Sequence, residues 1–233
     1  MNTKAWVAIL SCLPLGACTG SLFKSTISAP VAYVLSAAPA AAAPAAATPA
    51  AGGPAAGTPA DLIPADLRVL KPRMRPGLET ERIVAKYPDR RLDFYAGAKW
   101  NGSVDDVLQD LTVQLFQQRA RLRSVSVEGS RFTSGYWLEI EVEDFQAEYA
   151  AGSQPGAGAA PVIHVHMFAH LGRAADRAGL GSFEASASQA ASADRMEAIV
   201  AAYELATNQA LARIVDGVVD TLATATAVTT GAH

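Results

Sequence analysis

Two stretches in the second half of the chain alternate strictly between apolar and polar side chains. The apolar positions are Leu138, Ile140 and Val142 in the first stretch and Ile163, Val165 and Met167 in the second. The polar positions are Glu139, Glu141, Glu143, His164 and His166. Successive residues of a strand point to opposite faces, so the pattern predicts an antiparallel hairpin with one buried and one solvated face. The Gly/Ala/Pro-rich residues 150–161 supply its turn region.

Two further segments have the spacing of amphipathic helices. The first follows Ser103, a favoured N-cap residue, with Asp105 and Asp106 in the positive first turn. Its apolar stripe is Val104, Val107, Leu108, Leu111 and Leu115, and Arg119, Arg121 and Arg123 are expected towards its C-terminal end. The second helix is expected to begin near Ser192. Its stripe comprises Met196, Ile199, Val200, Tyr203, Ala206, Ala210, Ile214, Val218 and Leu222.

The remaining apolar runs are typical of short strands. They cover residues 67–70, 82–87, 91–100 and 183–187. The resulting order β-β-β-α-β-β-β-α indicates one α+β domain over residues 61–225, with a largely antiparallel mixed sheet and two long helices packed on one face. Residues 226–233 are expected to form a disordered tail.

The N-terminus has the features of a bacterial lipoprotein signal. Lys4 precedes an apolar run over residues 5–15, too short for a bilayer-spanning helix of about 20 residues. Leu15-Gly16-Ala17-Cys18 then reads as a lipobox. We expect residues 1–17 to be a signal peptide cleaved between Ala17 and Cys18, with the Cys18 thiol acylated. The alternative is a secretory peptide cleaved elsewhere, with an incidental cysteine.

The region between the anchor and the domain divides into a leash and an insertion. Residues 18–30 are expected to be the lipid-anchored leash, followed by a short β-prone run at 31–35. Residues 36–60 contain only Ala, Pro, Gly, Thr and one Ser, with proline at every fifth position from 39 to 59. This composition predicts a disordered segment, because it offers no large apolar group to a core. It is a loop if residues 31–35 pair into the domain, and a spacer across the cell wall if they do not.

Charge and cysteine content restrict the partners. The net charge is −3 at pH 7, and loss of Lys4 with the signal peptide makes the mature chain more acidic. A mildly acidic protein is not drawn to nucleic acid or to anionic lipid heads, so membrane attachment depends on acyl chains. Cys12 leaves with the signal peptide and Cys18 carries the lipid, which leaves the mature chain without a disulfide.

The two strand histidines form a candidate metal site. His164 and His166 share a strand face with Cα atoms ~6.6 Å apart, a spacing compatible with zinc. A third ligand would have to come from Glu139, Glu141 or Glu143, since His170 lies ~13 Å along the strand. We favour the alternative of solvated Glu–His pairs and predict no metal and no cofactor.

Sequence motifs for enzyme chemistry are absent. No G-x-S-x-G or P-loop occurs in the sequence, and the serine of Gly152-Ser153-Gln154-Pro155-Gly156 is one place out of position. We expect no catalytic residues. A metal hydrolase at the His164/His166 face is kept only as a third hypothesis.

Two aromatic residues are candidates for a partner surface. Tyr95 and Trp100 lie where a predicted strand leads into a helix. They are either core residues, which is the commoner fate and the one we favour, or part of an exposed contact rim, because interface cores are enriched in aromatic residues.

The layout resembles the ABC-type transport auxiliary lipoprotein family, which includes the paraquat-inducible protein C (PqiC) type. The resemblance is carried by the lipobox, by Tyr33-Val34-Leu35, by Leu67-Arg68-Val69, by Arg82-Ile83-Val84, by the run from Leu92 to Trp100 before a helix, by Leu138 to Phe145, and by Phe183 before a long alanine-rich helix. The insertion at residues 36–60 departs from the short connection usual there.

The resemblance implies a non-catalytic outer-membrane component that works beside an ABC ATPase, a permease and a substrate-binding protein with an MCE (mammalian cell entry) domain. Such systems move lipids between the inner and outer membranes. Thr19 after the acylated cysteine favours outer-membrane sorting, and the family suggests a ring of protomers. The alternative function is a stand-alone lipid-binding or outer-membrane assembly lipoprotein without an ABC partner.

Overall fold

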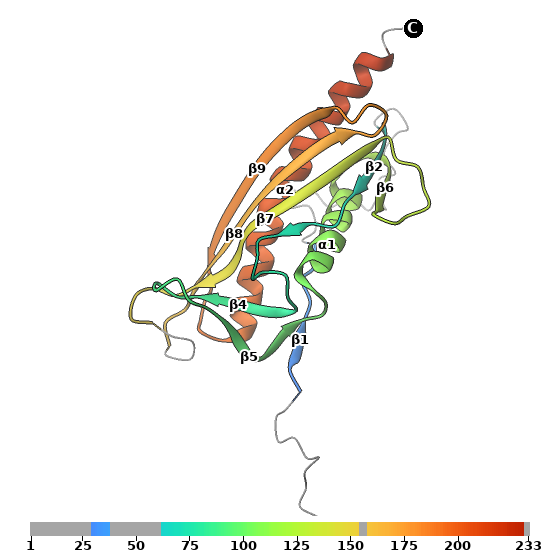
Figure 1. The fold of residues 1–233 in the computed structure, drawn as a ribbon. Coiled ribbons are helices and arrows are strands. Elements are labelled where there is room, and N and C mark those ends of the chain that lie inside the picture. Colours follow the sequence, from blue (N-terminus) through green and yellow to red (C-terminus); the bar gives the residue numbers. More distant parts are fainter. Residues whose placement is uncertain (1–28, 38–61, 154–157, 231–233) are drawn as a thin grey trace, which may run out of the picture.

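The computed structural model describes residues 29–37, 62–153 and 158–230, which form nine strands and two helices (Figure 1). The strands are β1 (Val31–Tyr33), β2 (Ile63–Val69), β3 (Arg73–Met74), β4 (Arg82–Lys86), β5 (Leu92–Trp100), β6 (Leu122–Val127), β7 (Tyr136–Glu148), β8 (Val162–Arg173) and β9 (Gly179–Ala190). The helices are α1 (Val104–Arg119) and α2 (Met196–Thr230). None of the helices in these ranges is long and apolar enough to cross a membrane.

The long strand β7 organises the sheet. One of its edges pairs in turn with β2, β3 and β4, all parallel, and its other edge pairs with β8 along nearly its whole length. β8 continues the antiparallel order to β9, while β5 and β1 extend the sheet beyond β4, and β6 lies beside β2. The prediction of a single α+β domain with a mixed sheet is confirmed. The antiparallel parts are the three-stranded meander β7–β8–β9 and the pair β4–β5.

Both helices cover one face of this sheet, and α2 runs behind β7, β8 and β9 (Figure 1). Most of the predicted α2 stripe is fully buried, from Ile199 to Leu222. Ser103 occupies the predicted N-cap of α1, but its hydroxyl bonds the Asp106 carboxylate at 2.7 Å instead of a backbone amide. Arg119 at the end of α1 donates to Asp216 of α2 at 3.2 Å, which ties the two helices together.

Residues 31–33 pair with β5, which selects the loop alternative for the insertion, so the domain begins before the insertion and the segment that follows β1 is a connection within the domain. Two predicted boundaries are corrected. α1 ends at Arg119, so Arg121 and Arg123 lie beyond the helix, and Arg123 belongs to β6, a strand not predicted from the sequence. α2 extends to Thr230, so most of the predicted disordered tail is helical, while residues 231–233 lie outside the described part.

A β-bulge divides β7 into two halves. The register with β8 shifts between Val142 and Asp144, so the buried positions change from even numbers to odd numbers at Phe145. Bulges bend a strand and redirect its side chains. This bulge decides which acidic residues can face the histidines of β8.

Shortening the Ala/Pro-rich connection should leave the domain folded. Before it, Leu35 is buried beside Leu111 and the Ser36 amide donates to Glu204 at 3.0 Å. After it, β2 begins beside Leu122, three residues beyond the end of α1 at Arg119, which lies ~12 Å from Leu111 along the helix. Deletion of residues 40–56 leaves about seven residues, which reach ~23 Å.

We therefore expect the deleted protein, purified in its lipidated form, to melt within ~3 °C of the wild type, because loop length has a small effect on closure entropy. Thermal unfolding followed by circular dichroism measures this. A loss of ~10 °C would show that the segment contributes to the core.

Candidate functional site

The predicted anchor residues Ala17 and Cys18 lie outside the described residues, so the lipobox remains a prediction. The other predicted site residues are all placed. They fall into two groups. The first is the aromatic pair Tyr95 and Trp100 on β5, and the second is the polar row on the open face of the sheet, which comprises Glu139, Glu141, Glu143, His164 and His166.

Both aromatic residues belong to the core, which corrects the alternative of an exposed contact rim. Trp100 is 1% exposed and packs on Phe145 and Tyr203, with ring centroids 6.0 and 5.2 Å away. Tyr95 is 9% exposed and its hydroxyl lies 2.9 Å from that of Tyr149. Burial raises the pKa of Tyr95, so the phenol stays neutral in this chain of hydroxyl groups.

The polar row does not assemble as the metal hypothesis required. Because of the bulge, Asp144 and Gln146 lie opposite His166 and His164, and the row of three glutamates lies further along β7. His166 approaches Glu184 of β9 at 3.0 Å, and His164 hydrogen-bonds Ser188 at 3.0 Å.

The glutamates are partnered by arginines instead of histidines. Arg73 on β3 pairs with both Glu139, at 3.0 Å, and Glu141. Within residues 29–37, 62–153 and 158–230, no three His, Cys, Asp or Glu side chains are grouped as metal ligands. The open face is therefore a set of cross-strand polar pairs.

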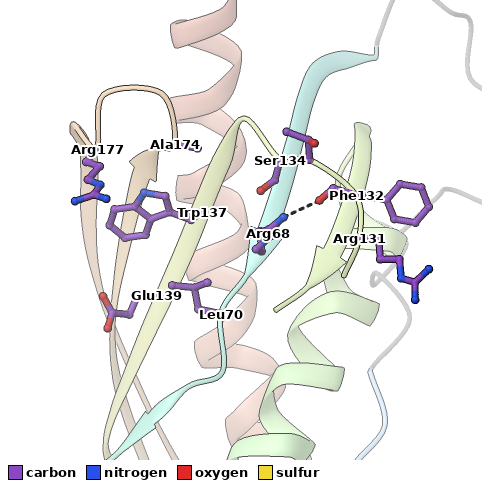
Figure 2. Close-up of a pocket in the computed structure, with 10 residues that line it drawn as sticks. Arg68, Leu70, Arg131, Phe132, Ser134, Trp137, Glu139, Ala174 and Arg177 are labelled. Carbon is purple, nitrogen blue, oxygen red and sulfur yellow. Dashed lines mark hydrogen bonds between the residues drawn. The ribbon is translucent and has the colours of Figure 1, made fainter. Parts of the chain in front are cut away.

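A cavity of about 580 Å³ lies where β7 begins, at the far end of the sheet from β1 (Figures 1 and 2). Three separate segments form it: β2 with the residue after it, the loop between β6 and β7 together with the start of β7, and the turn between β8 and β9. Its lining residues are Arg68, Leu70, Arg131, Phe132, Thr133, Ser134, Trp137, Glu139, Ala174 and Arg177.

Three arginines give this cavity a positive charge. Arg68 lies at its centre and donates from Nη2 to the Phe132 carbonyl at 2.6 Å, as Figure 2 shows. The Nε of Arg68 is buried and makes no hydrogen bond to any described residue. Arg131 and Arg177 are exposed, and the only carboxylate in the lining, Glu139, is paired with Arg73 outside it. The cavity can therefore attract anions although the whole chain is acidic.

The apolar wall is set by a close approach between a ring and a glycine. Trp137 on β7 is paired with Gly172 on β8, and a Cβ added at Gly172 would lie 2.1 Å from the Trp137 ring. Only glycine lets the indole lie flat on the neighbouring strand at this position. Trp137 is consequently held at the cavity wall.

Replacement of Gly172 by alanine should displace this ring. The added methyl overpacks the contact, so we expect a loss of ~1–3 kcal/mol in unfolding free energy together with a shift in the Trp137 emission spectrum. Gly135→Ala, just before β7, is the matched control, because an added Cβ there meets nothing within 4 Å. Equal emission spectra for the wild type and Gly172→Ala would contradict this packing.

No local pattern in the sequence indicates this cavity. Arg68, Arg131 and Arg177 lie far apart in the chain, and the approach of their segments depends on the pairing of β2 and β8 with β7. Even the exposure of Phe132, which has 75% of its surface accessible, is seen only in the structure.

Comparison with known families matches residues 33–215 to the family described as "ABC-type transport auxiliary lipoprotein component". The match runs from the end of β1 into α2. The chain belongs to this family. Its members are lipoproteins of ABC-type transport, so membership implies attachment to a membrane. A comparison with curated proteins finds no match.

Several solved structures are similar to this auxiliary lipoprotein. Protein XCC0632 of Xanthomonas campestris, a DUF330 protein, is 24% identical over 84% of this chain and 96% of that chain, with a TM-score of 0.61. Protein CT253 of Chlamydia trachomatis is 8% identical over 68% and 98%, with a TM-score of 0.47. The PelC dodecamer from Paraburkholderia phytofirmans is 12% identical over 66% and 88%, with a TM-score of 0.40. The likeness to XCC0632 supports the α+β fold.

Proposed function

We propose that this auxiliary lipoprotein is the non-catalytic outer-membrane component of an MCE-type lipid transport system, of the PqiC type. The observation that carries the proposal is the family match over residues 33–215, which spans nearly the whole described domain. The predicted partners are the MCE-domain protein, the permease and the ATPase of the same system.

The proposed mode of action is contact. The lipid on Cys18 holds the chain at the periplasmic face of the outer membrane, and the folded domain binds the MCE-domain protein. Outer-membrane sorting rests on Thr19 following the cysteine. The family resemblance implies that several copies associate in a ring. Such a ring would present the same contact surface several times around one axis.

Lipid transfer in cells tests the transport half of this proposal. Cells without the gene should exchange pulse-labelled phospholipid between inner and outer membranes several-fold more slowly than cells in which the gene is restored. Unchanged exchange would contradict a role in lipid transport and favour the stand-alone outer-membrane lipoprotein.

A further inference from the structure

We propose that the open face of the sheet, beside the turn between β8 and β9, binds a pyranose ring of an acidic glycan. One face of the sugar stacks on Trp137, its hydroxyl groups meet Glu139, His170 and Ser182, and its carboxylate meets Arg177. This inference goes beyond the proposed transport function and does not depend on it, because sugar binding is a property of the isolated chain.

The stacking surface is the indole of Trp137. Trp137 on β7 is paired with Gly172 on β8, and Gly172 is paired with Gly179 on β9, so neither neighbouring strand carries a side chain at these positions. Within residues 29–37, 62–153 and 158–230, the indole stacks with no other aromatic ring and has no arginine or lysine over its face. The partly exposed ring is therefore available to a ligand.

A second cavity, of about 540 Å³, adjoins this ring and shares Trp137 and Glu139 with the first one. It lies over β7, β8 and β9, and a row of three polar side chains crosses it. Glu139 on β7 is paired with His170 on β8, and His170 is paired with Ser182 on β9. We call these three residues the polar triplet.

The polar triplet is held in place and still has free hydrogen-bonding atoms. The Ser182 hydroxyl lies 3.0 Å from Nδ1 of His170, and Arg73 holds one carboxylate oxygen of Glu139 at 3.0 Å. The other oxygen of Glu139 and Nε2 of His170 make no hydrogen bond to any residue that the structure describes. Such a set of donors and acceptors suits the hydroxyl groups of a sugar, each of which donates and accepts.

The indole and the polar triplet together favour a sugar over other ligands that use an aromatic face. A pyranose has weakly positive C–H groups on its face and hydroxyl groups around its edge, and the face of an indole is negative. An acyl chain could cover the ring, but it would also cover the polar triplet without offering it any hydrogen bond, which is costly.

Arg177 gives the site a preference for an acidic sugar. Figure 2 shows Arg177 on the same side of β7 as Trp137 and Glu139, whereas Arg131 and Phe132 point outward on the opposite side. A guanidinium group matches the two oxygens of a carboxylate and binds them through charge-assisted hydrogen bonds.

The charge of Arg177 is free for such a ligand. The only acidic residue in the turn between β8 and β9, Asp176, is paired with Arg173 at 3.5 Å. Arg177 is exposed and forms no ion pair with any residue in the described part of the chain.

The test is a titration of the full lipidated chain anchored in phosphatidylcholine vesicles. The probes are trigalacturonate, its neutral counterpart galactotriose, peptide-free glycan strands of the cell wall, and citrate as an acyclic tricarboxylate. Binding is followed by calorimetry and by tryptophan emission, which reports on Trp137 because Trp100 is buried and Trp6 lies in the predicted signal peptide. We expect trigalacturonate to bind about tenfold more tightly than galactotriose, and citrate to leave the emission unchanged.

The source of the glycan follows from the same titration. Cell-wall strands that bind more tightly than trigalacturonate would identify the ligand as cell-wall glycan. The reverse order would identify it as a free acidic polysaccharide. Either order supports a sugar site.

Matched variants, measured by calorimetry, assign the binding to this face. Trp137→Ala should abolish binding of both oligosaccharides, whereas Phe132→Ala removes an exposed ring on the opposite side and should bind like the wild type. Arg177→Gln should remove the tenfold preference for trigalacturonate and leave galactotriose binding unchanged, whereas Arg131→Gln should keep the preference. Gly172→Ala, which moves the indole without removing it, should also weaken binding of both.

Three results would overturn the proposal. The absence of heat and of an emission change with every saccharide would exclude a sugar site. Citrate binding as tightly as trigalacturonate would make the site one for a simple anion. Equal loss of binding in Trp137→Ala and Phe132→Ala would remove the role of the indole.

Discussion

Trp100→Ala should cost ~3–5 kcal/mol of unfolding free energy, because the indole is 1% exposed and its removal leaves a cavity among large rings. The ring packs on Phe145 of β7 and Tyr203 of α2, and Tyr203 in turn donates to the Val84 carbonyl of β4 at 2.9 Å. The cluster therefore joins the neighbouring strands β5, β4 and β7 to the long helix α2. Since domains of this size are stable by only ~5–15 kcal/mol, the melting temperature should fall by about 10 °C or more.

Leu92→Ala on the same strand is the control, because Leu92 is 42% exposed. It should change the unfolding free energy by less than ~0.5 kcal/mol. Denaturant unfolding of both variants measures the difference. A Trp100→Ala protein as stable as the Leu92→Ala protein would contradict the packing of this core.

Cys18→Ser should release the protein from membranes almost completely. Each buried acyl CH₂ contributes ~0.8 kcal/mol, so two or three chains make attachment effectively permanent. Fractionation of cells into membrane and soluble parts, with a salt wash, measures the change.

The domain itself should be unaffected in this variant. The soluble Cys18→Ser protein should unfold at the same temperature as the wild type. A variant that still sediments with the outer membrane after the salt wash would contradict the assignment of the anchor.

The elements with strong periodicity were predictable from the sequence. The stripe of α2 and the alternation of the hairpin follow directly from the 3.6-residue and two-residue periods of helix and strand. The Gly/Ser/Ala-rich strand β9 was found only in its centre, around Phe183, because small residues give a weak apolar pattern.

The misplaced elements share a physical cause, which is that pairing overrode local preference. β6 has the sequence LRSVSV, and its arginine was read as a favourable charge at the end of a helix. In β7 the change of parity between Val142 and Phe145 is visible in the sequence and marks the bulge, yet alternation alone placed three glutamates beside the histidines. The cavity at the start of β7 could not be predicted, because it depends on contacts among three segments distant in the chain.

The fold separates the parts that the proposed function needs. The anchor precedes β1, the aromatic cluster holds β5, β7 and α2 together, and the arginine-lined cavity lies at the other end of the sheet (Figures 1 and 2).

The most direct test of the transport role is affinity purification of the full lipidated chain from membranes in a mild non-ionic detergent. The copurifying proteins are identified by mass spectrometry, with the Cys18→Ser protein as the control for membrane localisation. The account predicts that an MCE-domain protein, with its permease and ATPase, copurifies with the wild-type chain and is much reduced with the Cys18→Ser chain. Recovery of the chain alone, or with outer-membrane assembly proteins only, would contradict it.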